Sequence, residues 1–362
     1  MSEQDQNIEQ VASGDGQSVL GAGGEGGQPP AATPASGKTS RSRRRVLAIL
    51  GVILLAVIAL NAYYLLTRQP ITSLPVVRAV AKTTPPTYLF SISGLSEPFG
   101  VAVSPDGQRI YVTETGGARM VRVFDRSGKQ LLSFTLPGTA VPDRAPAYPA
   151  VDSLGRVYVP ERKQNVIAVY SPEGRHLGIF PKVQEGDKFI WAPLGVSVND
   201  AGEFLVTDTT VGEHQVWLFD ASGQMVTKFG KEGSGDGEFE YPNMAVMDHR
   251  SRIYVTDGSN GRVGMFDKDG KLLGYLGTGN AQGSIGLPRG LAIDTLDRLY
   301  AVDNVNGRIQ VFDAGADKPN YLFTLSGGGD KGMMLPNGIA TDSTGRIYVA
   351  STGAGEVQVW TY

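Results

Sequence analysis

The stretch PTYLFSISG, at residues 86–94, is nearly repeated as PNYLFTLSG at residues 319–327. The second copy lies inside a series of similar units and has the place of a fourth strand in its unit. The last unit of the series ends at Tyr362 before a strand of this kind is reached. We therefore expect residues 86–94 to supply the missing strand, because a ring that is closed by both ends of a domain leaves no sheet edge exposed.

The unit occurs six times between residue 86 and the end of the chain. Each unit begins with a proline, and successive prolines are 46 to 49 residues apart: Pro98, Pro146, Pro193, Pro242, Pro288 and Pro336. After the first apolar strand come strands such as RIYVTE (109–114) and VRVFD (121–125), then a turn such as DRSGK (125–129), in which glycine supplies a positive φ. The sequence predicts an all-β fold, a six-bladed β-propeller of four-stranded antiparallel blades over residues 86–362.

Three segments precede this domain. Residues 1–45 are rich in Gly, Ser, Ala, Gln and Pro, and they predict a disordered tail because they offer too little apolar surface to offset chain entropy. Residues 46–67 contain no charge and, as a helix, would match a hydrocarbon core of roughly 30 Å, so we expect a transmembrane helix. Residues 68–85 contain three prolines and predict a linker.

Arginines flank the apolar segment on one side. Arg41, Arg43, Arg44 and Arg45 precede it, so the positive-inside rule predicts a single-pass protein of the cell membrane with a cytoplasmic N-terminus and an extracytoplasmic propeller. A cleaved secretory signal is one alternative, but its apolar core is usually about 7 to 15 residues long. Residues 42–47 also resemble a twin-arginine export signal, so the route of export stays open.

Charge and cysteine content exclude several functions. The chain has no cysteine, which excludes disulfides, thiolate metal sites and a cysteine nucleophile. Residues 83–362 hold 25 basic and 31 acidic residues. This acidic balance argues against nucleic acid as a partner, because nucleic-acid binding needs a basic surface.

The stretch FGKEGSGDGEFEYPNMAVMD, at residues 229–248, resembles the linker and first strand of an NHL repeat. The resemblance extends over residues 86–362 and is to the membrane-anchored bacterial type of this six-bladed propeller family. It implies the fold given above. Members of the family serve as ligand sensors on receptor kinases, as RNA- or protein-binding platforms and as enzyme scaffolds, so the resemblance implies no single function.

The residues that follow the six leading prolines are candidates for a binding site, because the first strands of a propeller line its channel. They are Phe99, Ala147, Leu194, Asn243, Arg289 and Asn337. The last three come from consecutive blades, so they could converge on one small anionic or carbonyl ligand, with Arg289 supplying a planar fork of donors. The alternative is that they cap strand starts or hold channel water.

Two kinds of catalytic propeller provide a test for metal chemistry. Amidating lyases of this architecture hold zinc with channel histidines. The histidines of this chain are instead expected in solvated loops: His176, His214 and His249. Lactonases of the gluconolactonase type hold a divalent cation with a Glu/Asn/Asn/Asp quartet, which Glu97, Asn243 and Asn337 match in part, without a candidate for the fourth residue. We therefore expect no catalytic residue and no cofactor.

A second set of polar residues ends the second strands and recurs with the repeat. It consists of Glu114, Glu161, Asp208, Asp257, Asp303 and Ser351. We expect these side chains to bond loop amides rather than calcium. Arg262 and Arg308 each begin a third strand, and we expect them to be inter-strand partners.

The combination of an anchor, a rigid platform and an incomplete catalytic set leads to one hypothesis and one alternative. The hypothesis is a membrane-tethered, extracytoplasmic binding or scaffold propeller that recognises a protein, peptide or glycan. The alternative is a metal-dependent hydrolase or lyase that acts in the channel and is lactonase-like or amidating-lyase-like, an alternative that rests on analogy of fold.

Overall fold

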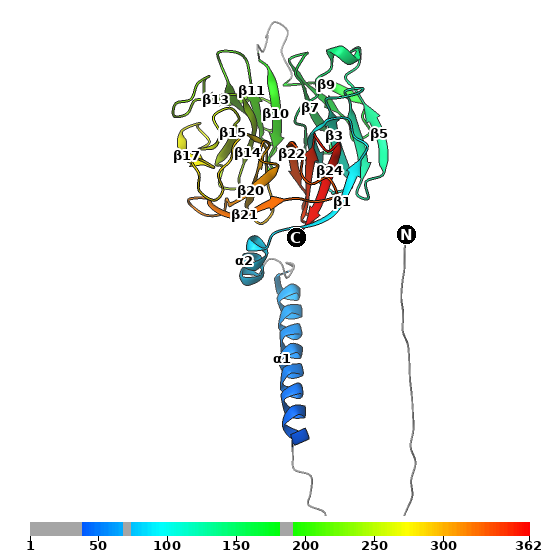
Figure 1. Cartoon of the computed structure of the whole chain (residues 1–362), viewed down its shortest axis with the longest axis vertical. Coiled ribbons are helices and arrows are strands. Elements are labelled where there is room, and N and C mark those ends of the chain that lie inside the picture. The colour runs from blue at the N-terminus through cyan, green and yellow to red at the C-terminus, as the bar shows by residue number, and fades with distance from the viewer. Residues whose placement is uncertain (1–37, 68–73, 182–190) are drawn as a thin grey trace, which may run out of the picture. The chain divides into compact units, whose positions relative to one another are not determined.

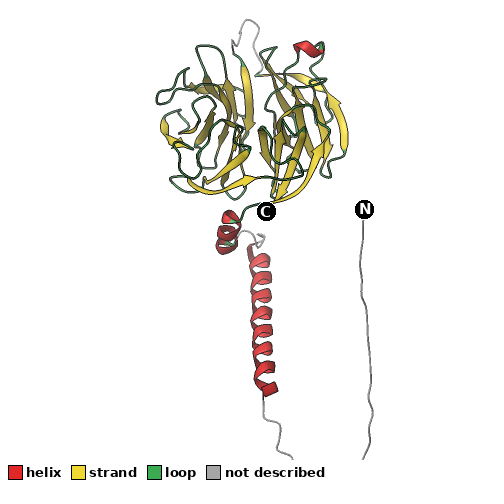
Figure 2. Ribbon diagram, in the orientation of Figure 1, coloured by secondary structure: helices red, strands yellow, loops and turns green. Residues whose placement is uncertain are grey.

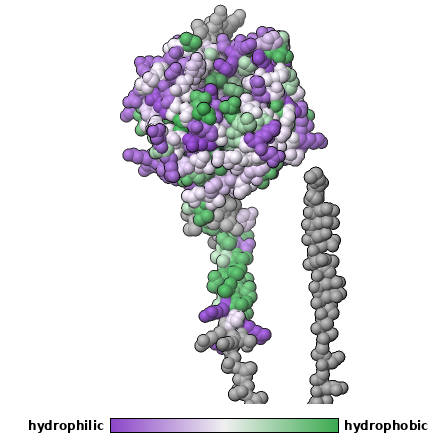
Figure 3. Space-filling view, viewed as in Figure 1, coloured by the Kyte–Doolittle hydropathy of each residue, from purple (hydrophilic) through white to green (hydrophobic). Residues whose placement is uncertain are grey.

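The computed structural model describes residues 38–67, 74–181 and 191–362, and the chain divides into two units, residues 1–69 and 70–362. The first unit contains helix α1 (Lys38–Thr67), which is drawn in Figure 1 and whose apolar residues are green in Figure 3. Residues Ser42–Leu65 are long and apolar enough to cross a membrane. The helix begins eight residues before the predicted start at 46, because arginine and serine extend a helix that is already formed. Residues 1–37 of the predicted tail lie outside the described residues.

The second unit contains six four-stranded antiparallel sheets, shown as yellow arrows in Figure 2. Blade one consists of β2 (Pro98–Val103), β3 (Arg109–Glu114), β4 (Val121–Asp125) and β5 (Gln130–Phe134). Blade two consists of β6 (Ala150–Val151), β7 (Val157–Glu161), β8 (Val166–Tyr170) and β9 (His176–Phe180). Blade three consists of β10 (Pro193–Val198), β11 (Phe204–Asp208), β12 (Gln215–Phe219) and β13 (Met225–Phe229). Blade four consists of β14 (Pro242–Met247), β15 (Ile253–Asp257), β16 (Arg262–Phe266) and β17 (Leu272–Leu276). Blade five consists of β18 (Pro288–Ile293), β19 (Arg298–Asp303), β20 (Arg308–Asp313) and β21 (Asn320–Ser326). Blade six consists of β22 (Pro336–Thr341), β23 (Arg346–Ser351), β24 (Glu356–Thr361) and β1 (Thr87–Ser93). The predicted six-bladed β-propeller is confirmed.

Strand β1 closes the ring as the sequence predicts. It pairs antiparallel with β24, so that Tyr88 lies opposite Trp360 and Ile92 lies opposite Val357. The rings of Tyr88 and Trp360 are 5.7 Å apart in an edge-to-face arrangement. Ile92 and Val357 are buried in the core between blades six and one. The first and last parts of the domain therefore share one sheet and one core.

We name the two faces of the propeller by its first strands. These strands begin at the upper face, with the leading prolines, and end at the lower face. A repeated arrangement at the lower face joins the first and second strands of several blades. In blade five, Asp294 accepts hydrogen bonds from Arg298 Nε (2.7 Å) and from the Tyr300 hydroxyl (2.9 Å). The same arrangement occurs in blades two and four, at Asp152, Arg156 and Tyr158 and at Asp248, Arg252 and Tyr254.

The predicted linker 68–85 contains a helix, α2 (Pro75–Thr83), that sequence reasoning missed. Proline is compatible with a first helical turn, where no intrahelical partner is lost, so Pro75 begins this helix rather than preventing it. Arg78 forms an ion pair with Asp297 (2.7 Å), and Lys82 forms one with Asp313. The segment is therefore in part a helix docked on the lower face of blade five, whereas residues 68–73 lie outside the described residues.

Candidate functional site

The structure brings two of the three predicted polar residues of the channel mouth into contact. Arg289 Nη1 donates to Asn243 Oδ1 (2.8 Å). Asn243 is fully buried, and its Nδ2 donates to the carbonyls of Tyr241 (3.0 Å) and Pro288 (3.2 Å). The amide of Asn243 therefore ties blade four to blade five and orients the guanidinium. Arg289 Nε is buried and has no hydrogen-bond partner among the described residues.

Asn337 does not join this pair. Its Nδ2 donates to the Thr352 hydroxyl (2.6 Å), and that hydroxyl donates to the carbonyl of Pro98 (2.6 Å). This chain of bonds links blade six to blade one. Capping and joining of strand starts, the alternative weighed from the sequence, thus accounts for Asn337.

The apolar members of the predicted ring lie in the core. Ala147 and Leu194 are buried, and Phe99 is half-buried with its ring 4.6 Å from that of Tyr148. Tyr148 was not among the sequence candidates, although its hydroxyl is buried and unpartnered within the described part of the chain. Burial raises the pKa of Tyr148 well above its usual range. The phenol is therefore a neutral donor beside the channel.

The next residue along each first strand is glycine in four of the six blades and a large residue in the other two. Four blades have glycine there: Gly100, Gly195, Gly290 and Gly338. A Cβ at Gly195 or at Gly290 would lie 2.5 Å from a backbone carbonyl oxygen of the next blade, so these strands approach too closely for any side chain. The other two blades place Tyr148 and Met244 at this level, and both are buried in one cluster. The side chains of Tyr148 and Met244 are thus the large ones at a level where the other four blades have no side chain.

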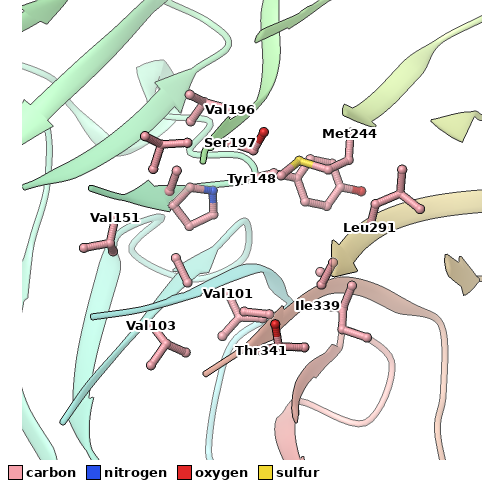
Figure 4. A pocket seen from close by; sticks show the side chains of 18 residues that line it. Val101, Val103, Tyr148, Val151, Val196, Ser197, Met244, Leu291, Ile339 and Thr341 are labelled. Carbon is pink, nitrogen blue, oxygen red and sulfur yellow. The ribbon is translucent and has the colours of Figure 1, made fainter. Parts of the chain in front are cut away.

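Below this level the channel widens into a cavity of about 190 Å³. Figure 4 shows the side chains that line it, with Tyr148 and Met244 at one side and Val103, Val151 and Thr341 at another. No lining residue is ionisable at neutral pH. The hydroxyls of Ser197 and Thr341 donate to the carbonyls of Ala245 (2.7 Å) and Ile293 (3.0 Å). The side chains that line the cavity are therefore mostly aliphatic and uncharged, whereas polar atoms contribute much of the surface that faces it.

The residues expected to match a lactonase-type metal quartet do not fit a cation together. Glu97 is exposed, with its carboxylate 3.5 Å from the Thr115 hydroxyl. The amide oxygen of Asn243 accepts from Arg289, so a cation there would lie against a guanidinium. Among the described residues, no group of three or more His, Asp or Glu side chains has the arrangement of a metal site. We derive no metal-dependent step for this channel.

The prediction of solvated histidines is wrong for one of the three. His214 is 2% exposed, and its Nδ1 lies 3.2 Å from the carbonyl oxygen of Phe239. Its ring packs 4.9 Å from that of Tyr241, in the loop before β14. The sequence places His214 in a loop, but a loop packed under its neighbour excludes water. His176 and His249 are exposed as expected.

The polar residues that end the second strands bond loop amides, as predicted. Each accepts from a backbone N–H in the loop before its own blade's first strand; the pairs are Glu114 with Ser96, Glu161 with Ala145, Asp208 with Ala192, Asp257 with Glu240, Asp303 with Gly286 and Ser351 with Met334. Arg262 and Arg308 form ion pairs with Asp257 (2.8 Å) and Asp303 (2.9 Å), which confirms them as inter-strand partners. Burial raises the pKa of Glu161 to about 7. This ring is structural.

Comparison with known proteins agrees with the propeller. Residues 192–362 match the model of the SMP-30/Gluconolactonase/LRE-like region. Protein lin-41 of Caenorhabditis elegans is 53% identical over 53 residues, which are 15% of this chain and 4% of that protein. Protein brain tumor of Drosophila melanogaster is 28% identical over 133 residues, 36% of this chain and 12% of that protein. The chain thus spans a small part of the length of these relatives.

Solved structures of the same fold include a streptogramin B lyase, with a TM-score of 0.54 and 16% identity over 76% of this chain and 98% of that one. A catalytically inactive variant of virginiamycin B lyase from Staphylococcus aureus, solved with quinupristin, has a TM-score of 0.51 and 16% identity over 77% and 98% of the two chains. At this identity the likeness concerns the fold. Together with the repeat pattern, the family model and the two relatives support an NHL-like β-propeller.

Proposed function

We propose that this chain is a membrane-tethered recognition propeller that binds a protein or peptide outside the cytoplasm, through the upper face of blades four to six. The observation that carries the proposal is a group of large apolar side chains exposed in the upper loops of these blades. The group consists of Tyr241, Val305, Met334 and Leu335. Exposed apolar side chains that gather on one face are typical of a binding surface.

The backbone of this surface supports the proposal. Tyr241 and Leu335 each precede a leading proline and have positive φ, 58° and 45°. This conformation costs a residue other than glycine about 1 kcal/mol or more, and such costs concentrate at functional sites. The strained backbone directs two large side chains outward at the channel mouth, where they are 49% and 53% exposed. The exposure of these two side chains contributes no free energy to folding.

Arg289 supplies the polar part of the proposed surface. It is half-buried, and Asn243, which also donates to the carbonyl of Tyr241, fixes one edge of its guanidinium. Aromatic and arginine side chains surrounded by apolar residues are the commonest strong contacts of protein interfaces. The surface therefore suits a peptide segment that presents an apolar side chain and a carboxylate or carbonyl group. A glycan offers less apolar area to these side chains.

The test uses the full chain in lipid nanodiscs and selection from a displayed peptide library. We expect selected peptides to lose at least tenfold in affinity for Tyr241→Ala and for Leu335→Ala. Leu154→Ala is the control, because Leu154 is even more exposed than Tyr241 and Leu335 but belongs to a lower turn of blade two. Peptides that bind all three variants equally, or selection of glycans from an array without any peptide, would contradict the proposal.

A second candidate function is hydrolysis or lyase chemistry in the channel, and the match of residues 192–362 to the gluconolactonase-like model favours it. It is tested by incubating the full chain with gluconolactone and with a streptogramin B antibiotic, each with and without divalent cations. Turnover that is lost in Asn243→Ala would support this candidate. The recognition proposal expects no turnover above that of a heat-denatured sample.

The membrane orientation is part of the proposed function and has its own test. Arginines at 43–45 lie in the first turns of α1, before its apolar part. A protease added outside intact cells should degrade the chain after Thr67 and leave an N-terminal tag protected. Replacement of Arg43, Arg44 and Arg45 by glutamine should weaken this asymmetry. A tag that is digested in the unaltered protein would reverse the assignment.

A further inference from the structure

We propose that the upper mouth of the channel binds a carboxylate group of the ligand through the guanidinium of Arg289. This inference rests on the function proposed above and makes it more specific, because it requires an anion where the upper face alone also suits a neutral carbonyl group. Arg289 directly follows the leading proline of β18, so it lies where the first strand of blade five begins at the upper face.

The hydrogen bonds of Arg289 leave one end of its guanidinium free. Nη1 donates to Asn243 Oδ1 (2.8 Å), while Nε is buried without a partner among the described residues. Nη2 also has no partner there, but it is not buried. Arg289 does not line the lower cavity, so this accessible end faces the upper mouth. A carboxylate in the mouth can therefore accept from Nη1 and Nη2 together, in the planar geometry that arginine favours.

The charge of Arg289 is not neutralised within the described part of the chain. The side chain is half-buried and forms no ion pair with an Asp or Glu residue there. Other buried or half-buried arginines of the propeller pair with buried aspartates: Arg252 with Asp248, Arg262 with Asp257, Arg298 with Asp294 and Arg308 with Asp303. The partner of Arg289 is instead the neutral amide of Asn243, although burial removes part of its hydration. A bound anion supplies the missing counter-charge.

The surroundings of the Tyr148 hydroxyl agree with a positive channel mouth. This hydroxyl is buried, and Figure 4 shows Tyr148 beside Met244, the residue after Asn243. Burial raises the pKa of the Tyr148 phenol, and the positive charges of Arg289 and then Arg162 act in the opposite direction. Arg162 is exposed directly after β7, at the upper end of blade two. One half-buried guanidinium with a second cation at the rim suits a singly charged carboxylate better than a phosphate dianion.

The experiment measures binding of N-trifluoroacetyl-leucine to the full chain in nanodiscs, by fluorine NMR relaxation of the probe. The corresponding leucinamide has the same apolar side chain but no charge, and empty nanodiscs correct both probes for uptake by lipid. We expect saturable binding of the acid with an affinity at least tenfold above that of the amide. Equal affinities of acid and amide overturn the proposal, and so does a lack of binding by both carboxylate probes, of which the second is given below.

Variants locate the bound carboxylate. Arg289→Gln should lower the affinity for the acid at least tenfold. Arg289→Lys keeps the charge without the planar fork, and it should lower the affinity about threefold to tenfold. The matched control is Arg144→Gln, because Arg144 is a half-buried arginine of the upper loops whose three guanidinium nitrogens donate to Thr139 and Ala118. It should leave the affinity unchanged. Unchanged affinity in both Arg289 variants, or an equal loss in Arg144→Gln, overturns the proposal.

A second probe distinguishes the two sources of a peptide carboxylate. N-trifluoroacetyl-glutamate α-amide carries its carboxylate on the side chain, whereas the leucine probe carries it at the chain end. Preferred binding of the leucine acid assigns the site to a C-terminus, and preferred binding of the glutamate amide assigns it to an acidic side chain. Both results support a carboxylate site.

Failure of the carboxylate site and failure of the recognition function give different results. Selected peptides that require Tyr241 and Leu335 but bind equally well with and without a carboxylate overturn the carboxylate site and leave the recognition function intact. Conversely, Arg289-dependent binding of the acid without any selected peptide supports the carboxylate site and contradicts peptide recognition.

Discussion

Blades two and five lie on opposite sides of the six-fold ring and share one repeat, but they are stabilised differently. In blade five, β18 has six residues, whereas β6 of blade two has two. The buried acid of blade five, Asp303, forms an ion pair with Arg308 (2.9 Å). The equivalent acid of blade two, Glu161, has no ion pair among the described residues and accepts from the backbone N–H of Ala145 (3.1 Å).

The lower turns repeat the contrast. Arg298 of blade five is fully buried, contacts the ring of Tyr362 at 3.9 Å and donates to the carbonyls of Ala81 (3.2 Å) and Thr84 (3.3 Å). Its counterpart in blade two, Arg156, is 43% exposed and contacts its own turn. Blade five therefore holds the end of α2 and Tyr362 through one buried arginine, in addition to the pairing of β1 with β24 in blade six. Blades with the same order of strands can thus contribute quite differently to the free energy of unfolding.

The largest expected difference between the two blades follows from replacing these arginines. Arg298→Met leaves the buried carboxylate of Asp294 without its cation and releases Ala81 and Thr84, so we expect a loss of about 3 to 5 kcal/mol in unfolding free energy. Arg156→Met should cost about 1 kcal/mol or less, since that pair is exposed on one side. The measurement is urea unfolding of the full chain in nanodiscs, followed by tryptophan fluorescence. Equal losses in the two variants would remove the contrast.

The second largest difference expected between the two blades is in how their contribution to the unfolding free energy changes with pH. The pKa of the Glu161 carboxyl is about 7 in the folded chain because of burial, against 4.5 when exposed, so the folded state holds its proton more tightly. Stability from this group is complete below about pH 4.5 and falls as the pH rises to about 7, by roughly 3 kcal/mol. Glu161→Gln should remove that decline. If the variant and the unaltered chain lose stability in parallel between pH 5 and pH 8, another group is responsible.

Two tyrosines should respond to the same change with opposite signs. Tyr300→Phe in blade five removes the bond to Asp294 and should cost about 1 to 2 kcal/mol. Tyr148→Phe in blade two removes a buried hydroxyl that is unpartnered in the described chain, and it should be neutral or stabilising by about 1 kcal/mol. Thermal unfolding of both variants beside the parent checks the signs. A clear loss for Tyr148→Phe would mean that its hydroxyl has a partner.

The smallest effect is expected at α2. Arg78 is 43% exposed, so Arg78→Ala should lower the unfolding free energy by less than about 1 kcal/mol. Hydrogen exchange should nevertheless become faster at the amides of Arg78 and Thr84, which donate to Leu74 and Val80 inside this short helix. Unchanged exchange would show that Lys82 and Arg298 hold α2 without Arg78.

The sequence predicts the fold well because its signals are local and repeated. The leading prolines, the turn glycines and the copy of the fourth strand at 86–94 each indicate one structural position, and all are confirmed. Helix α2 escaped prediction because nine residues are too short for a clear period and Pro75 suggested a linker. Its stability comes from Asp297 and Asp313, more than 200 residues away in the chain.

The candidate site is less accessible to sequence reasoning. Contact between Asn243 and Arg289 follows from their places in adjacent blades, but the separate bonding of Asn337 depends on Thr352, which has no special pattern. Tyr148 and Met244 could have been found, since they interrupt the glycine that four other first strands have at the same place. The burial of His214 could not, because it depends on how one loop packs beneath the next. Ligand identity stays a prediction.

Closure by β1 has a consequence for biosynthesis. The strand at Thr87–Ser93 leaves the ribosome long before its partner at Glu356–Thr361 is translated. Until then β1 lacks its partner and blade six cannot form, so the nascent domain exposes strand edges throughout its synthesis. A pairing this distant in sequence also forms slowly, since the loop-closure entropy is lost before the contact is gained. A chaperone that shields unpaired strands would therefore act on this domain until β24 has left the ribosome.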